Sequence, residues 1–555
     1  MLDHIVQISL KFRLLVLVAL VAIVGFGARA WQQVPVDAFP DVTPVQVGVL
    51  TESPGLAPED VERLLTSPIE STLAGLPGVS AVRSVSIFGL SAVTVYFADG
   101  TDIYFARRLV GERLQAARGQ IPEGFGEPQL GPNSSGLGQV FWYTVETVDR
   151  RFSNTELRTL QDWTIRVQLR TVPGVDEITS MGGEEKQFQV LVDPNKLVSY
   201  GLTFKTVMEA LLSNNRQVGG QSINVGPESF VVRGVGRVAN IENLAQVPVG
   251  GPEGTPVHLR DIAELREAGG PRVGAATRDG REVVLGIALQ RIGENAKTVA
   301  TAVKDKLAVI QRSLPEGVKI NTIYDRTSLV DHAVSTATRA LLEGSVLVAI
   351  VLFLFLGEVR SALVVVMTLP LAMLTAFILM QQVGLSANLM SLAGLAVGIG
   401  MMIDGAVVLV ENAYRLLAGA QPEETRLDVV RRAALEVAKP IAFAILIIIV
   451  VFLPLFSLTD IEGKLFRPMA LSITFAMIGS LVLTLTVTPV LSSFILRATP
   501  ENDTWLMRHA KRLYAPVLES SLNHKKRTLL VALVSGKPAR RLISSCHPRA
   551  CRRCP

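Results

Sequence analysis

Cysteine is nearly absent from this chain of 555 residues, and the little it has lies at one end. Cys546, Cys551 and Cys554 fall in the last ten residues, so the body of the chain can hold neither disulfides nor thiolate metal sites. Their C-x4-C-x2-C spacing fits a zinc or copper hook. The basic tail at 536–555 abruptly replaces an apolar run, however, which favours an aberrant end produced by a frameshift or truncation.

Catalytic motifs and a surplus of basic charge are also missing. The six histidines are scattered without ligand spacing, and the sequence has no H-E-x-x-H motif, P-loop or Ser/His/Asp grouping. Hydrolysis and ATP use are therefore unsupported, and we expect neither an enzyme nor a bound cofactor. The net charge is +5, but six cations belong to the last twenty residues. Without them 48 basic residues oppose 49 acidic ones, which excludes a nucleic-acid partner.

Long apolar runs are what the chain has in abundance. It is 49% hydrophobic and 19% charged, with a mean hydropathy of +0.39, which predicts membrane spans joined to a water-facing module. The run Leu14–Ala30 predicts a first span within residues 1–31, with the N-terminus in the cytoplasm. Five further runs predict spans two to six within residues 336–498: Leu341–Leu356, Ala362–Val383, Leu389–Leu417, Ile441–Leu458 and Ala470–Leu496.

Charges between these runs predict the orientation of the chain. With the N-terminus inside, the long water-compatible stretch at 32–335 lies outside. The segments 415–439 and 497–527 then lie inside and are rich in Lys and Arg, whereas the short outside loops hold only Lys464 and Arg467. We expect residues 499–527 to form a cytoplasmic linker helix. A seventh span begins at 528–535 and breaks off at Gly536.

The sequence pattern of the outside module predicts a large α+β fold. Its first part follows the split βαβ (ferredoxin-like) order: strand 45–51, helix 57–73, strands 79–87 and 91–97, and helix 102–118. The Pro-Gly-Val joint at Leu76–Val79 recurs at Val172–Val175, after a helix at 154–171, and predicts a second copy. We expect a third unit at 282–325 and an inserted hairpin in the Gly-rich segment Gly219–Pro252. One irregular α/β domain is the alternative.

One acidic residue lies deep inside an apolar run. Asp404 is near the middle of the fourth run, where an ionised carboxylate costs about 2.5–3.5 kcal/mol, so we expect its side chain to face protein or water. Glu411 follows seven residues later on the same helical face. Two carboxylates in line favour a proton relay, with Asp404 as its carrier and Glu411 as a possible second member. Alternatively, Asp404 only hydrogen-bonds a neighbouring helix, and Glu411 marks the cytoplasmic interface near Arg415.

Methionines are the other potential ligands within the spans. Eight of the twelve fall in or directly beside predicted spans three to six, where thioether pairs could pass Cu(I) or Ag(I). Methionine is also an ordinary filler of apolar interiors, and we favour that interpretation. Met390 and Met402, on the predicted Asp404 helix, stay as weak candidates for a metal site. The sequence does not identify the metal.

Four segments are characteristic in combination: VPVDAFPDVTPVQV at 34–47, FGLS at 88–91, DGTDIYFAR at 99–107 and DGAVVLVEN at 404–412. With them the chain resembles the N-terminal half of an inner-membrane pump of the resistance–nodulation–division superfamily, in its heavy-metal-efflux branch. The resemblance runs from the first span to about Val534. In it, Asp404 matches the fourth-helix aspartate that carries protons in the family.

The resemblance implies a function and partners. Such pumps are proton-driven antiporters of the bacterial inner membrane that work as homotrimers with a periplasmic adaptor and an outer-membrane channel to expel metal cations. The drug-exporting branch has two adjacent aspartates where this chain has Asp404 and Gly405, which favours the metal branch. Gly398 stands where divalent-cation members often carry Asp, and copper–silver members tend to have Ala at the place of Gly405, so the metal stays open.

The length of the chain is its largest departure from that family. Family members have two homologous halves and twelve spans, so by resemblance this chain is one half, truncated before the partners of Asp404 on later helices. We expect half a pump not to transport alone, because alternating access needs both repeats. A pump for organic compounds and a non-transporting fragment are the alternatives.

Overall fold

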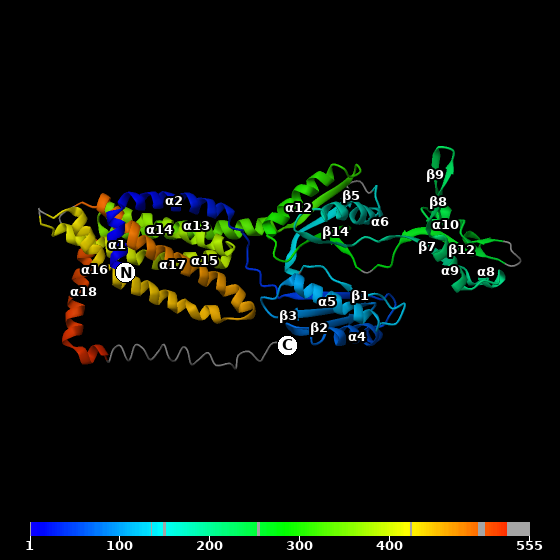
Figure 1. Ribbon diagram of the computed structural model, residues 1–555, viewed down its shortest axis with the longest axis horizontal. Coiled ribbons are helices and arrows are strands. Elements are labelled where there is room, and N and C mark those ends of the chain that lie inside the picture. The colour runs from blue at the N-terminus through cyan, green and yellow to red at the C-terminus, as the bar shows by residue number, and fades with distance from the viewer. Residues whose placement is uncertain are drawn as a thin grey trace. The chain divides into compact units, whose positions relative to one another are not determined.

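The computed structural model describes residues 2–134, 136–147, 151–251, 256–272, 274–421, 424–497 and 505–529 (Figure 1). The chain divides into two compact units. Unit 1 comprises Met1–Val42 and Val330–Pro555, and unit 2 comprises Thr43–Leu329. The predicted outside module, 32–335, contains unit 2 and exceeds it at both ends. Most of the predicted seventh span at 528–535, and the whole tail with its three cysteines, lie outside the described residues.

Unit 1 is built from helices. Six of its described helices are long and apolar enough to cross a membrane, and each overlaps one predicted apolar run. They are α2 (Arg13–Gln33), α13 (Arg326–Leu356), α14 (Val359–Val383), α15 (Leu389–Ala418), α16 (Arg426–Phe452) and α17 (Asp460–Ile495). The short helix α1 (Leu2–Lys11) packs through Val6 and Leu10 into the same core, and α18 (Trp505–Asn523) follows α17.

Two of these helices begin about four turns before the apolar run that predicted them. Helix α13 starts at Arg326, although its apolar run starts at Leu341, and α16 starts at Arg426, ahead of a run that starts at Ile441. Apolar length detects only the part of a helix that suits hydrocarbon. The start of α16 is instead set by its cap, because the Thr425 hydroxyl accepts a hydrogen bond from the Asp428 backbone N–H at 3.3 Å.

The centre of unit 1 is formed by α14, α15 and α17. In the most apolar stretch of each of these helices at least half of the residues are buried. In the corresponding stretches of α2, α13 and α16 less than a fifth of the residues are buried. Figure 1 shows the three central helices running side by side. The approach of α15 to α17 depends on Gly394, since a Cβ atom there would lie 2.7 Å from the Met469 carbonyl oxygen and would also clash with Ser472.

Unit 2 begins with a sheet covered on one face by helices. The elements are β1 (Gln46–Glu52), a helix over Pro58–Leu73 (α3 and α4 around a π-helical turn), β2 (Val79–Ile87), β3 (Leu90–Phe97), α5 (Ile103–Arg118) and β4 (Gln129–Leu130). The strand order is β2-β3-β1-β4, and all three pairings are antiparallel. Alternate residues of β1 and β3, such as Val47, Val49, Val93 and Val95, are buried against the helices.

A second sheet in unit 2 has the same topology. Its elements are β5 (Gln139–Thr147), a helix over Asn154–Leu169 (α6 and α7), β6 (Val175–Met181), β14 (Arg281–Gln290), α12 (Ala296–Gln311) and β15 (Val318–Asp325), with the short β13 (Ala276–Arg278) paired to β14. Strand β14 lies between β6 and β5, and β15 lies beyond β5, so the order β6-β14-β5-β15 repeats that of the first sheet.

This topology corrects the prediction of a third unit at 282–325. These residues do not form a separate subdomain, because β14 pairs with both β5 and β6 and thereby completes the second copy. Residues 186–269 are inserted between β6 and β14. A pattern along the chain does not reveal pairing between strands about 100 residues apart, so it predicts the two halves of the second copy as different units.

The two copies also share a local distortion. The first helix of each contains one π-helical turn, at Glu62–Thr66 and at Gln161–Ile165. Each turn buries a polar side chain over the sheet. The Thr66 hydroxyl lies 2.8 Å from that of Ser86 and 2.7 Å from that of Ser91, whereas Gln161 accepts from Tyr143 at 3.1 Å. A π turn is rare and shifts the helix by one residue, so its recurrence supports the internal repeat.

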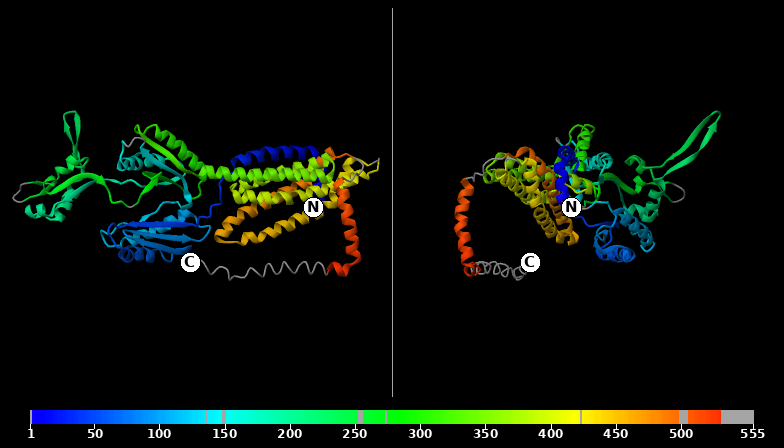
Figure 2. Two further views of the ribbon diagram at one scale, coloured as in Figure 1. Left: turned by 180° about the vertical axis from the view of Figure 1, so that it is seen from behind. Right: turned by 60° about the vertical axis from the view of Figure 1, so that its left-hand side comes forward.

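The inserted segment forms a small third subdomain. Its elements are β7 (Lys186–Val192), α8 (Pro194–Ser199), α9 (Phe204–Asn214), β8 (Gln217–Val225), β9 (Glu228–Val235), α10 (Ile241–Ala245), β10 (Pro248–Gly250), β11 (Val257–His258), α11 (Leu259–Ile262) and β12 (Ala263–Gly269). Strands β8 and β9 pair only with each other, inside the region predicted to hold a hairpin. Figure 2 shows this hairpin projecting from its subdomain in both views. The end of the predicted region, Pro252, lies outside the described residues.

The last strand of unit 2 leads directly into α13. Asp325 accepts hydrogen bonds from the Thr327 backbone N–H at 2.9 Å and from Lys304 Nζ at 3.0 Å. Burial alone would raise the pKa of the Asp325 carboxyl, but these hydrogen bonds outweigh it and hold the pKa below its usual range. The carboxylate is therefore ionised at neutral pH and caps the first turn of α13.

Candidate functional site

Asp404 lies in the middle of α15, as the sequence predicts. Its side chain is exposed, on the one stripe of α15 that the rest of unit 1 leaves uncovered. The exposed residues of this stripe recur every three or four positions and are Ala393, Ala396, Val397, Gly400, Asp404, Val408, Glu411 and Arg415. The structure thus places Asp404 and Glu411 on the same face, about 10.5 Å apart along the helix axis at 1.5 Å per residue.

The opposite face of α15 is fixed by contacts to its neighbours. The Ser480 hydroxyl of α17 donates to the Met402 carbonyl oxygen at 2.6 Å. A Cβ atom on Gly405 would meet Ile441 of α16 at 3.0 Å, so this turn of α15 sits tightly against α16. Because both contacts lie on the buried side, they set the rotation of α15 that turns Asp404 outward.

Neither carboxylate of the stripe has a partner among the described residues. No ion pair or hydrogen bond joins the side chain of Asp404 or Glu411 to another side chain in this part of the chain. Glu411 lies one turn before Arg415, but that guanidinium is directed to Asn412 instead. The stripe therefore presents two unpaired acids, seven residues apart, among small and apolar residues, with Arg415 as a further charge near the end of the helix.

Asn412 is a residue of this site that the sequence analysis did not single out. Its side chain is buried, and its amide nitrogen donates to the Ala433 carbonyl oxygen at 3.1 Å and to Glu436 Oε2 at 3.0 Å. Its amide oxygen accepts from Arg415 at 2.9 Å. The signal in the sequence was one asparagine at the end of an apolar run, but its partners on α16 lie more than twenty residues away. We infer that Asn412 positions α15 against α16.

Asn412→Ala is expected to lower the free energy of unfolding of the chain by about 1–3 kcal/mol, because Glu436 and a buried carbonyl lose their donor. The measurement is thermal unfolding of the purified chain in detergent. Asn523→Ala, at an exposed asparagine at the end of α18, is the matched control and should leave the transition unchanged. Equal midpoints for Asn412→Ala and the unmodified chain would contradict the positioning role.

The methionine candidates are not brought together. Met390 and Met402 are twelve residues apart on one straight helix, about 18 Å along its axis, and cannot bind the same ion. Met402 is buried, and its Cε atom fills the space beside Gly398. Among the described residues no group of three or more His, Cys, Asp or Glu side chains could hold a metal ion. The surroundings of Met402 are therefore those of a packing side chain, and a metal-binding role for Met390 or Met402 stays a prediction.

Comparison with known proteins places these features in a family. The model of the AcrB/AcrD/AcrF family matches residues 5–537. The chain is 45% identical over 550 residues to the cation efflux system protein CzcA of Alcaligenes sp. (strain CT14) and 40% identical over 546 residues to the cation efflux system protein CusA of Escherichia coli O157:H7. Each alignment covers 96% of this chain and 52% of the relative, so the chain spans about half the length of these curated relatives.

The fold agrees with that comparison. The crystal structure of a heavy metal efflux pump matches with a TM-score of 0.84 and 32% sequence identity, over 98% of this chain and 52% of that one. The six apolar helices and the family together indicate a multi-pass inner-membrane protein. The chain belongs to the AcrB/AcrD/AcrF family, within the resistance–nodulation–division superfamily and among relatives that are heavy-metal efflux pumps.

Proposed function

We propose that this chain takes part in the proton-driven export of metal cations across the inner membrane, and that Asp404 carries the protons. The observation that carries the proposal is the position of Asp404, in the middle of a spanning helix and on its uncovered face. An ionised carboxylate facing lipid there costs about 2.5–3.5 kcal/mol. The face therefore has to be covered by protein or reached by water, and both allow protons to be taken up and released.

The occupant that we propose for this face is a second set of helices. The relatives are about twice as long as this chain, and their other half is the partner of the right size. Ala393 and Gly400, on the same stripe as Asp404, are small enough to allow another helix to approach closely. A basic group on that helix would pair with Asp404 when it is ionised and separate from it when it is protonated. Glu411 is proposed as a second member of the relay, nearer the cytoplasm.

The orientation follows from the charges around the helices. We propose that the N-terminus and the segment before α16, with Arg426, Arg431 and Arg432, lie in the cytoplasm. Unit 2 then lies in the periplasm as a module of two split βαβ (ferredoxin-like) layers and their insertion. The segment around α18 is proposed to be the cytoplasmic linker helix.

The β8–β9 hairpin is the proposed contact between copies in a homotrimer. It exposes Val218, Ile223, Phe230 and Val231, although a two-stranded hairpin alone is marginally stable in water. Exposed apolar side chains on a projecting arm are typical of a protein interface. A periplasmic adaptor and an outer-membrane channel are proposed as the further partners, with unit 2 as the part of the chain that reaches them.

Tolerance assays test this function at the chain's own chromosomal locus, where every partner that the host makes is present. Loss of the chain is expected to lower tolerance to metal salts and to abolish metal efflux that depends on the proton gradient. Tolerance to dyes and detergents should not change. Sensitivity to dyes alone would favour export of organic compounds, and unchanged tolerance to all of them would favour a non-transporting fragment.

A further inference from the structure

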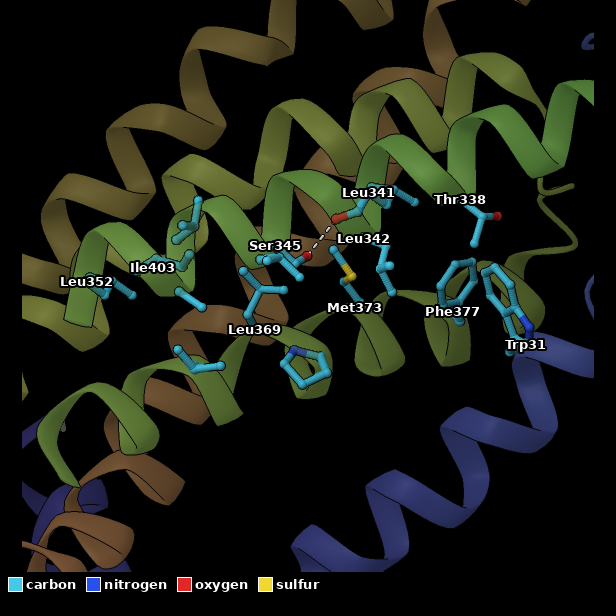
Figure 3. A pocket seen from close by; sticks show the side chains of 15 residues that line it. Trp31, Thr338, Leu341, Leu342, Ser345, Leu352, Leu369, Met373, Phe377 and Ile403 are labelled. Carbon is cyan, nitrogen blue, oxygen red and sulfur yellow. Dashed lines mark hydrogen bonds between the residues drawn. The ribbon is translucent and has the colours of Figure 1, made fainter. Parts of the chain in front are cut away.

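Unit 1 contains an apolar pocket of about 410 Å³ between α13 and α14 (Figure 3). Among the residues that line it, only Thr338 and Ser345 carry a hydroxyl group. The Ser345 hydroxyl already donates to the Leu341 carbonyl oxygen at 2.7 Å, drawn as the dashed line in Figure 3. No charged side chain lines the pocket. Its surface therefore suits a ligand that makes almost no hydrogen bonds.

The pocket is elongated along the helices. On α13 its lining runs from Thr338 to Leu352, which are 14 residues apart and so about 21 Å along the axis. Figure 3 shows Trp31 and Phe377 beside Thr338 at one end, and Leu352 and Ile403 at the other. At the first end the rings of Trp31 and Phe377 pack edge to face with centroids 4.6 Å apart. The space is thus long, with an aromatic end and an aliphatic end.

The pocket is open along one edge of α13. Leu342 and Val346 line it, yet they are 66% and 51% exposed. Ile350, one turn after Val346, is exposed and apolar as well, so the mouth lies beside a surface that suits hydrocarbon. At the aromatic end Trp31 is two residues from the end of α2, a position typical of tryptophan at a membrane interface. Arg339, next to Thr338, is exposed at this end.

We propose that this pocket binds one acyl chain of a membrane phospholipid, with the phosphate near Arg339 and the chain end near Ile403. A flexible hydrocarbon chain needs no hydrogen bonds and fits a long, narrow, apolar space. The aromatic pair lies where the ester region of a lipid would lie, and the guanidinium of Arg339 complements the phosphate charge. The long, narrow shape of the pocket, rather than its apolar lining alone, favours an acyl chain, because bulk lipid is as apolar as the pocket itself.

The test uses the full chain in lipid nanodiscs that contain a phosphatidylethanolamine with a diazirine at the end of one acyl chain. After illumination and proteolysis, mass spectrometry locates the labelled residues. Labelling is expected at the inner end, at Leu352, Leu369 and Ile403. Labelling spread evenly over Leu347, Ile350 and other exposed residues would overturn the proposal.

Substitutions that fill the pocket provide a second test of the proposal. Ala349→Phe, which places a ring in the space, is expected to reduce labelling at Leu352 and Ile403 by about tenfold, the ratio that about 1.4 kcal/mol of lost binding produces. Leu347→Phe, at an exposed position on the same helix outside the lining, is the matched control and should not change it. If Ala349→Phe fails to fold, Ser345→Leu fills the same space with less volume. Undiminished labelling in a folded variant, or displacement by an equal amount of free fatty acid, would overturn phospholipid binding.

Discussion

Replacement of Asp404 by Asn at the chromosomal locus is expected to reduce proton-driven metal export to the level of a strain that lacks the chain. Asparagine keeps the size of the side chain but cannot take up or release a proton. It also removes the cost of a charge inside the span, so insertion and the amount of chain in the membrane should be unchanged or higher. The measurement is metal efflux from preloaded cells, with and without an imposed proton gradient.

The control for this substitution is the same chemical change outside the spans. Asp305 is an exposed aspartate on α12, and Asp305→Asn should leave export unchanged. Glu411→Gln is expected to have a smaller effect than Asp404→Asn, because Glu411 lies nearer the end of α15 and Arg415. Export that persists in Asp404→Asn and still responds to the proton gradient would remove Asp404 from the mechanism.

The sequence predicted best what depends on spacing along one helix or strand. A period of 3.6 residues places Asp404 and Glu411 on one face, and the structure has them on one stripe. The apolar runs located the six helices that are long and apolar enough to cross a membrane, and the three predicted strands of the first sheet lie within one residue of their predicted ends. The fourth strand of that sheet, the two-residue β4, was not predicted. These features are local, because hydropathy and turn residues act over a few positions.

Features that depend on distant residues could not be read in this way. The second sheet is completed by β14, about 100 residues after β6, and the local pattern predicts its two parts as separate units. The partners of Asn412 lie on another helix, and no spacing within α15 identifies them. The pocket beside Trp31 arises only when α2, α13 and α14 are packed together. Distance in the sequence, rather than weak local preference, limited the prediction.

The close contact between α15 and α17 gives the second large expected effect. Gly394→Ala is expected to lower the free energy of unfolding by about 1–3 kcal/mol, because the added Cβ atom would lie 2.7 Å from the Met469 carbonyl oxygen and against the Ser472 hydroxyl. Backbone atoms of α17 cannot rotate away, so the two helices have to separate. The measurement is thermal unfolding of the purified chain in detergent.

Gly398→Ala, four residues later on the same buried side of α15, is the matched control for this substitution. A Cβ atom there would meet Met402 Cε at 3.8 Å and Ala476 Cβ at 3.9 Å, which are ordinary contacts. Alanine is also the better helix former, so this variant should be as stable as the unmodified chain or slightly more stable. Equal losses at both positions would mean that any side chain on this face is harmful, whereas a loss at Gly394 alone identifies the point at which α15, and with it Asp404, is held against α17.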